Sequence, residues 1–503
     1  MSRTPIGVGI TVVTLVFLTT SAIAYSTTAE EVQELRERVE ELEQQLADDT
    51  EASDTVAGDT EVGEDEVGED ETGEGLELTL RPHDTLPRRA QVHSRAGRRE
   101  PFEPRGAEIG RINDIRFNLG FHVVGRGQWM TQSDTFVHDG TAFSEPRSLS
   151  PGMQTGFANV DFQLDIGGDI ELFFDGLFAT QRHPTRFWGH QGYFYIRQMP
   201  ENTPLAAFNN IFEYIDVKAG NFYVDFGNEI HRRSLNADVQ RNPLIGNPIV
   251  TPHGIEPGLE IIHKGDFDGR YYGVMAGAGT GAPEQDFGRD RRFSVRGKAW
   301  FEPNETVQVA GSFYHVDHGE TVDRGSNLFR RERLGTPYSS VWNFGDDDSG
   351  SGEAPGQVRI GDGRRVTAGQ ADLNWDITDR LFLNSHFGFV NASGADPSYR
   401  TGTERWLYYG ADTTFYVTDD IYIAGRYSEA NSRKFLTSDN TGRVGRAQLG
   451  GGVWLTDRLL LKTEYVYQYS TGFNEGTRGV AGNVDVGQDP SFHGAIFEAS
   501  YSF

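Results

Sequence analysis

Residues 228–254 hold the side chains of this sequence that are best suited to act on small ions. The stretch gathers acidic, basic and histidine residues: Glu229, His231, Arg232, Arg233, Asp238, Arg241 and His253. Opposed charges across a narrow passage create a transverse field that orders water and sorts ions by sign and size. If the chain encloses a passage, we expect this stretch to form its constriction. The alternative is that the charges only solvate a surface loop.

The familiar catalytic motifs do not occur in the sequence. The chain has no cysteine, which excludes disulfides, thiolate metal sites and cysteine nucleophiles. His122 and His386 are candidates for acid–base chemistry, but no serine has the G-x-S-x-G context of a hydrolase nucleophile. No H-E-x-x-H metal motif occurs either. We therefore predict that the protein is not an enzyme and needs no metal or cofactor.

Composition narrows the class of protein further. The 503 residues carry a formal net charge of −28, and 61 of them are glycine, 33 phenylalanine and 19 tyrosine. So acidic a chain argues against a nucleic-acid partner. Its mean hydropathy of −0.51 is too polar for a bundle of membrane-spanning helices. A membrane β-barrel remains compatible, because only alternate residues of its short strands face lipid.

Residues 1–24 predict export from the cytoplasm. Arg3 precedes an apolar run that begins at Ile6 and ends in Ala22-Ile-Ala24. A basic start, an apolar core and an A-x-A end are typical of a cleavable secretory signal peptide. An uncleaved amino-terminal anchor is the alternative.

Residues 25–47 predict a short coiled coil that joins three chains. Apolar residues recur at spacings of three and four, as a and d positions do: Val32, Leu35, Val39, Leu42 and Leu46. The segment from Arg38 to Glu43 resembles a motif of three-stranded coiled coils, in which an arginine reaches a glutamate of the neighbouring helix. A helix this short needs neighbouring copies to be stable, so we expect a homotrimer. The alternative is a solvated, charged helix.

Residues 48–111 predict a linker made of an acidic segment followed by a basic segment. Its first part is acidic and repeats Glu-Val-Gly-Glu-Asp at 61–65 and 66–70, whereas residues 81–105 are rich in arginine. Self-repulsion and glycine favour an extended, unstructured chain. The basic part suits anionic lipid, cell-wall polymer or the acidic linker itself, and the sequence does not choose among them.

From about residue 112 the sequence alternates between apolar and polar residues. Ile115, Phe117, Leu119 and Phe121 alternate with more polar neighbours, and the same pattern recurs to the end of the chain. A period of two is that of a β-strand with two different faces. We count about sixteen such segments, an even number of the size found in channel-forming barrels. The predicted fold class is all-β: an antiparallel transmembrane β-barrel over residues 112–503, with the coiled-coil helix on the periplasmic side.

The connections between these segments alternate in length. Short connections alternate along the chain with long, polar loops. The short ones include residues 378–380, 418–420 and 456–458, and the long ones include 228–254 and 319–365. Sorted loop lengths are typical of outer-membrane barrels, whereas a soluble sandwich has no reason to sort them. Residues 228–254 then form the third long loop. Between 190 and 227 we expect one strand at Gly192–Gln198, a turn around Pro200–Asn210 and another strand at Phe212–Gly227.

The alternation also predicts which charged residues point into the barrel. The inward basic residues are Arg116, Arg126, Arg292, Arg296, Lys298, Arg426, Arg446 and Lys462. The inward acidic residues are Asp161, Asp165, Glu171, Asp175, Asp225, Asp372, Glu464 and Glu498. A ladder of basic groups favours small anions such as carboxylates or phosphate. The alternative is that the two signs only pair with each other. Aromatic residues near strand ends, among them Trp129, Trp375, Trp406, Tyr408 and Tyr409, fit interfacial girdles.

The final strand, Ser491–Phe503, predicts how the barrel closes. Its apolar face ends in Tyr501 and Phe503. This resembles the closing strand of Gram-negative outer-membrane barrels, whose final phenylalanine is read by the barrel-assembly machinery. We expect it to pair with the strand near Ile112. An edge strand of a soluble β-sandwich is the alternative.

Two stretches resemble a known family. Residues 215–227 hold a V-x-x-G-x-F-x-V-x-F-G pattern similar to a strand of the phosphate-selective porins of the O and P type, and residues 258–279 resemble the hairpin that follows. DcaP-like porins, which share the coiled coil and the trimeric barrel, are similar as well. The resemblance implies a trimeric channel of about sixteen strands whose third external loop folds inward. The lysine cluster of the phosphate-selective type is not evident here, so phosphate selectivity is not carried over.

These patterns together predict an outer-membrane porin of a Gram-negative bacterium. Its water-filled channel passes small hydrophilic solutes, with a slight lean towards small anions, and its expected partners are lipid, two further copies and the assembly machinery. The alternative is a structural tether with a plugged barrel and a periplasmic coiled-coil contact.

Overall fold

The computed structural model describes residues 106–502 with gaps at 113, 133–135, 139–140, 144–146, 168, 180–186, 202, 233–235, 282–292, 318–327, 330–337, 339–340, 342–364, 394–402, 435–441, 473–484 and 487–490. All described residues belong to one compact unit, residues 74–503. The predictions for residues 1–105, namely the signal peptide, the coiled coil and most of the linker, lie outside the described residues. Arg233, Arg292 and Phe503 lie outside them as well.

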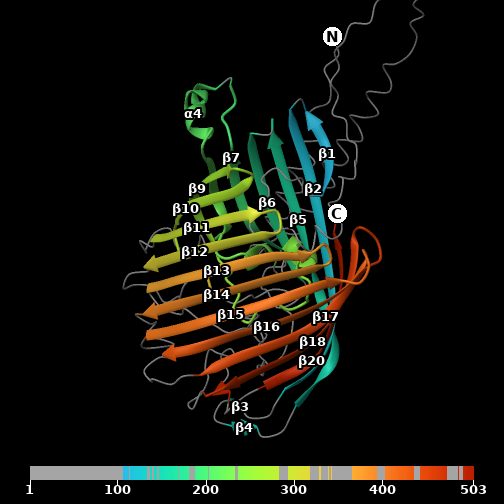
Figure 1. The fold of residues 1–503 in the computed structure, drawn as a ribbon. Coiled ribbons are helices and arrows are strands. Elements are labelled where there is room, and N and C mark those ends of the chain that lie inside the picture. Colours follow the sequence, from blue (N-terminus) through green and yellow to red (C-terminus); the bar gives the residue numbers. More distant parts are fainter. Residues whose placement is uncertain are drawn as a thin grey trace, which may run out of the picture. The chain divides into compact units, whose positions relative to one another are not determined.

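The main sheet has 17 antiparallel strands, and sixteen of them form a closed ring (Figure 1). In ring order these are β2 (Ile115–Gln132), β5 (Arg147–Ile166), β6 (Ile170–Ala179), β7 (Phe187–Ile196), β8 (Asp216–Tyr223), β9 (Ile255–Phe267), β10 (Arg270–Gly279), β11 (Phe293–Asn304), β12 (Val307–Asp317), β13 (Arg365–Thr378), β14 (Leu381–Ser393), β15 (Thr403–Tyr416), β16 (Ile421–Lys434), β17 (Arg443–Trp454), β18 (Leu459–Thr471) and β20 (Ser491–Ser502). The predicted all-β barrel of sixteen strands is confirmed.

The ring closes where the last strand meets the first long one. Strand β20 pairs with β2 from His122↔Ser502 to Gln132↔Phe492. The short strand β1 (Ala107–Ile112) pairs with the remaining edge of β2, from Ala107↔Leu119 to Ile112↔Ile115. The sheet therefore begins at residue 107, within the range that the sequence assigned to the linker. A small second sheet holds β3 (Phe136–His138), β4 (Thr141–Phe143) and β19 (Asp485–Val486).

Apart from residues 197–215 between β7 and β8, which lie at the same end as the tight turns, loop lengths are sorted between the two ends of the barrel. At one end, two-residue or similarly tight turns join β9 to β10 and β11 to β12, and Asp268 and Gly269 adopt the positive φ values of 55° and 71° that such turns require. At the other end lie the long connections, including residues 224–254 with the helical turns η2 (Glu229–Arg232) and η3 (Asn236–Arg241). Figure 1 shows β3 and β4 at this end and α4 at the other. None of the helices among the described residues is long and apolar enough to span a membrane.

The predicted strand boundaries between 190 and 227 are wrong. Strand β7 ends at Ile196, and β8 runs only from Asp216 to Tyr223. Between them lie the 3-10 helix η1 (Pro204–Phe208) and the helical turn α4 (Asn209–Phe212). Pro204 opens η1 because its missing N–H is not needed at a helix start. Past Tyr223 the chain turns away from the sheet, so Gly227 (φ 70°) belongs to the loop.

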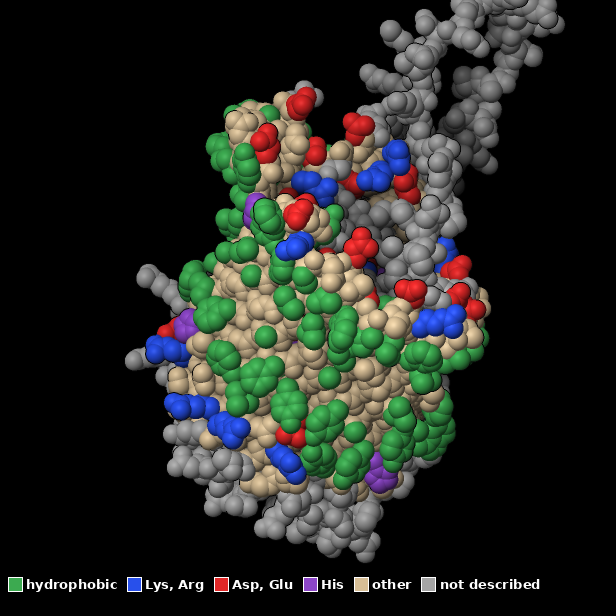
Figure 2. Space-filling model, in the orientation of Figure 1, with side chains coloured by type: hydrophobic (Ala, Val, Ile, Leu, Met, Phe, Trp, Pro, Cys, Tyr) green, Lys and Arg blue, Asp and Glu red, His purple; other side chains and the backbone are tan. Residues whose placement is uncertain are grey.

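The two faces of the ring differ in chemistry. Large apolar side chains such as Phe387, Tyr465 and Leu449 are 52%, 52% and 67% exposed on the outward face, which Figure 2 shows as a band poor in charge. Many charged side chains of the strands point inward and are buried, among them Arg126, Arg296, Asp412 and Glu464. Trp129, Trp375 and Tyr409 are exposed outward as predicted, but Trp406 and Tyr408 are buried inside the ring. Trp406 and Tyr408 lie an even number of residues from Asp412 on β15, whose side chain points inward, and side chains two residues apart on a strand share a face. They therefore point inward too and pack on loop residues instead of a lipid interface.

Candidate pore constriction

The connection from β8 to β9, which we call the inner loop (residues 224–254), packs inside the ring. Its apolar residues Val224, Phe226, Ile249 and Val250 form one buried cluster with inward-facing residues of β12–β17: Tyr314, Val316, Val366, Ala368, Val390, Ala392, Trp406, Tyr408, Ala430 and Val444. Leu328 and Phe329, from the connection between β12 and β13, join the same cluster. Apolar residues at the two ends of the inner loop thus bind it to the wall, because burial removes them from water.

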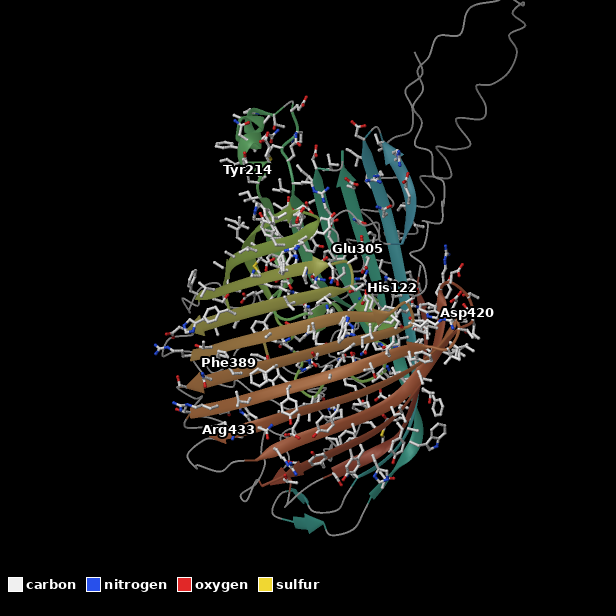
Figure 3. All side chains as sticks on the ribbon, in the orientation of Figure 1. His122, Tyr214, Glu305, Phe389, Asp420 and Arg433 are labelled. Carbon is white, nitrogen blue, oxygen red and sulfur yellow. The ribbon has the colours of Figure 1, made fainter. Side chains whose placement is uncertain are left out.

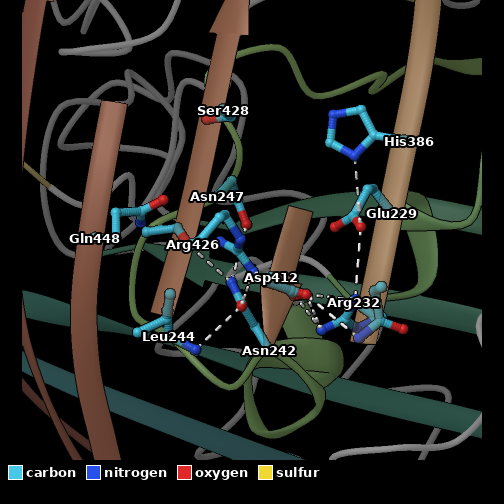
Figure 4. A network of polar contacts seen from close by, with 12 residues as sticks. Glu229, Arg232, Asn242, Leu244, Asn247, His386, Asp412, Arg426, Ser428 and Gln448 are labelled. Atoms are coloured by element: carbon cyan, nitrogen blue, oxygen red, sulfur yellow. Dashed lines mark hydrogen bonds and ion pairs between the residues drawn. The ribbon is translucent and has the colours of Figure 1, made fainter. Parts of the chain in front are cut away.

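A buried ion-pair network connects the start of the inner loop to the wall (Figure 4). Arg232 donates to both carboxylate oxygens of Asp412 on β15, at 2.8 Å to Oδ1 and 3.2 Å to Oδ2. Arg426 on β16 approaches the same carboxylate at 3.5 Å, and Glu229 lies 3.5 Å from Arg232 and 3.9 Å from His386. Burial opposes charge on Arg232, but Asp412 and Glu229 raise its pKa, so the guanidinium stays charged.

Three basic residues of neighbouring strands hold the backbone of the inner loop. Lys462 donates to the carbonyl oxygens of residues 239, 242 and 244 at 2.8, 3.3 and 3.4 Å. Arg426 donates to the carbonyl of Gly246 at 2.6 Å, and Arg446 donates to that of Asn247 at 2.8 Å. These cations therefore satisfy carbonyl groups that would otherwise be buried without partners.

A single carboxylate on β18 binds backbone amides of the inner loop. Glu464 accepts from the amides of Ile245 and Gly246 at 2.7 and 2.9 Å, and from the hydroxyl of Tyr338 in the connection between β12 and β13. Burial and the neighbouring carboxylate raise the pKa of Tyr338, which keeps its hydroxyl protonated as a donor. A Cβ at Gly246 would clash with the Tyr338 hydroxyl, so only glycine fits there.

The remaining inward basic residues also have acidic partners. Arg126 donates to Glu498 at 2.7 Å, Lys298 to Asp225 at 2.7 Å, and Arg296 to Glu260 at 2.7 Å and to Glu256. Arg116 pairs with Asp165, and Lys462 also pairs with Glu498 at 2.6 Å. Each of these basic residues thus lies against a carboxylate, whereas the inward carboxylates of Glu171 and Asp175 accept from the neutral side chains of Gln163, Tyr193 and Gln191.

The structure places the predicted constriction residues in different surroundings. Glu229 and Arg232 lie in the buried network, and Arg241 ends η3 and is half-buried. His231 and Asp238 lie in η2 and η3, but their side chains are not described. At the chain end, Tyr501 is 39% exposed on the outward face of β20.

Sequence reasoning missed three carboxylates that complete these pairs. Asp412 alternates with Ala411 and Thr413 in an inward phase that was available from the pattern. Glu256 and Glu260 lie on β9, where Gly258 and Pro257 obscure the period of two.

Three residues at the barrel seam form a serine–histidine–aspartate chain. Ser502 Oγ lies 2.5 Å from His122 Nδ1, and His122 Nε2 lies 3.5 Å from Asp161. Ser502 and His122 are direct partners in the β20–β2 ladder, so strand pairing alone brings them together. A hydrolase would also need preorganised donors for an oxyanion. Among the described residues, no group of three or more histidine or acidic side chains is arranged to hold a metal ion.

Fold and site together define the class: a closed, sixteen-stranded antiparallel barrel with a long loop bound inside it. No protein-family model and no curated protein sequence matches the chain. Among solved structures, it is similar to the outer membrane channel DcaP of Acinetobacter baumannii (11% identity, TM-score 0.45), covering 77% of this chain and 97% of that one. OmpT of Vibrio cholerae (10%, 0.42, 78% and 99%) and an anion-selective porin from Comamonas acidovorans (10%, 0.42, 77% and 100%) are similar as well.

Proposed function

We propose that the protein is an outer-membrane porin, a water-filled channel through which small hydrophilic solutes diffuse. The observation that carries the proposal is the closed ring with an apolar outward face and a charged inward face. An outward apolar band suits lipid, and barrels of this size have room for water inside. Residues 1–24 then direct export, and Tyr501 and Phe503 serve the assembly machinery. The amino-terminal segment lies in the periplasm, where residues 25–47 join three copies.

The inner loop narrows this channel and sets its size limit. The Arg232–Asp412 pair brings both signs of charge into direct contact where the loop meets the wall, so the pair itself adds little net charge to the passage. The slight lean towards small anions rests on Arg232, Arg233 and Arg241 together with the basic residues of the wall. Because the described wall cations are paired with carboxylates or carbonyl groups, we expect this selectivity to be weak.

A plugged barrel that acts as a structural tether is the second candidate. It is favoured by the apolar clusters inside the ring, in which Leu328, Phe329, Tyr338 and Val341 from the β12–β13 connection pack beside the inner loop. Such packing fills space that a wide channel would leave to water.

Ion current across planar lipid bilayers separates the two candidates. The porin should give discrete, stable conductance steps that scale with the salt concentration. A folded barrel that carries no current at any voltage would refute the channel and leave the tether.

A further inference from the structure

The connection between β7 and β8 carries a stripe of exposed apolar side chains. Leu205, Phe208, Ile211 and Tyr214 are 50%, 53%, 53% and 66% exposed. They recur every three residues, and in the 3-10 geometry of η1 the side chains at i and i+3 lie above one another. We call residues 197–215 the rim lobe. Gathered apolar side chains of this size mark a contact surface.

The rim lobe is tied to the outward face of the barrel. His263 faces outward on β9, beside Val274, which is 50% exposed. Its Nδ1 atom lies 2.6 Å from the carbonyl oxygen of Tyr214, and its Nε2 atom lies 3.3 Å from the hydroxyl of Tyr272. Phe267, at the end of the same strand, is 71% exposed. The apolar stripe therefore continues the surface that faces lipid in the proposed function.

The lobe has two chemically different sides. Figure 2 shows hydrophobic side chains on the side that lies above the apolar band, with acidic side chains towards the tip and the other side. Figure 3 places Tyr214 at the base of the lobe, next to the barrel. Short amphipathic segments with aromatic residues lie in the plane of a membrane interface, apolar side down.

We propose that the rim lobe is an interfacial anchor that inserts Leu205, Phe208, Ile211 and Tyr214 into the leaflet at the tight-turn end of the barrel. The anchor rests on the proposed placement in a membrane. A lipid surface fits the lobe because the stripe is continuous with the lipid-facing band, whereas its acidic side is left to water. The anchor fixes the depth and tilt of the barrel at that leaflet.

The absence of cysteine allows a direct test by single labelling. Phe208→Cys in the full-length protein receives an environment-sensitive fluorophore in vesicles of phosphatidylethanolamine and phosphatidylglycerol. Glu201→Cys, on the same lobe but outside the stripe, is the matched control. The Phe208 label should emit at shorter wavelength than the control, and nitroxide-bearing lipids should quench it more strongly.

Two results would overturn the anchor. One is quenching of the Phe208 label by aqueous iodide to the same extent as the control. The other is a Phe208 label that neither iodide nor the nitroxide-bearing lipids quench, together with disulfide cross-links between copies of the unlabelled Phe208→Cys variant. This combination would show that the lobe is an interface between chains. Ion current measured on the same labelled samples distinguishes failure of the anchor from failure of the proposed porin. A barrel that conducts while its lobe is exposed to water refutes only the anchor.

Discussion

Asp412 connects the inner loop to the wall of the barrel. Its carboxylate is buried and meets two guanidinium groups, those of Arg232 and Arg426. Neutralising it takes the carboxylate away from Arg426 and leaves Arg232 with only the more distant carboxylate of Glu229, in a buried place. Pairs of this kind add little when intact but are costly to break from one side.

We therefore expect Asp412→Asn to destabilise the folded barrel by roughly 3–5 kcal/mol, the usual range for a buried pair broken from one side. Urea unfolding in lipid vesicles, followed by circular dichroism, measures the effect. Glu305→Gln, at an exposed position in a tight turn (Figure 3), is the control and should leave stability unchanged. Equal midpoints for the two variants would show that the network does not stabilise the fold.

The charge of the inner loop should decide the sign of any selectivity. Replacing Arg232 and Arg233 by alanine removes two positive charges and leaves the Asp412 carboxylate with Arg426 as its cationic partner. The reversal potential in a salt gradient should then shift towards cations. Arg270→Ala, exposed at the tight-turn end, is the control. An unchanged reversal potential in the double variant would remove these arginines from the filter.

At the scale of elements, the inner loop depends on close contact with the β12–β13 connection. Gly246→Ala would push a methyl group against the Tyr338 hydroxyl and the Gln448 amide. We expect a loss of roughly 1–3 kcal/mol in stability, as for other overpacked sites. The displaced loop should also change the single-channel conductance. Gly311→Ala is a matched control, because a Cβ there meets no atom within 4 Å. Identical conductance in both variants would mean that the Gly246 contact does not shape the passage.

The elements also show how far the sequence could be interpreted. Period-two alternation located most strands and the inward phase of Arg426, Lys462 and Glu464, because strand geometry alone fixes that phase. It did not reveal that Arg232 meets Asp412, 180 residues away in the chain. Arg232 lies in the inner loop, so the packing of that loop against the wall decides its partner. The local sequence around Arg232 or around Asp412 does not contain this information. The helical turns at 204–212 were missed although Leu205, Phe208 and Ile211 recur at spacings of three.

At the scale of the whole molecule, the predicted homotrimer remains to be tested. The native mass in mild detergent should equal three chains. Leu35→Asp combined with Leu42→Asp places charges in the predicted coiled-coil core and should lower that mass or its resistance to dilution. Glu41→Gln, off the a and d positions, should not. A monomer for the unmodified protein would refute the trimer without bearing on conductance.

Strand β1 has a consequence for how the cylinder finds its alignment. A closing strand can slide along its partner by two residues without exchanging its faces, so polarity alone does not fix its position. Along β2, however, the edge from Ile115 to Leu119 is already occupied by β1. Strand β20 pairs with this edge only from His122 onward, so it cannot slide further in that direction while β1 is paired. Residues 107–112 thus limit the register of the closing strand in one direction, and register is one of the quantities that set the strand tilt of a closed barrel.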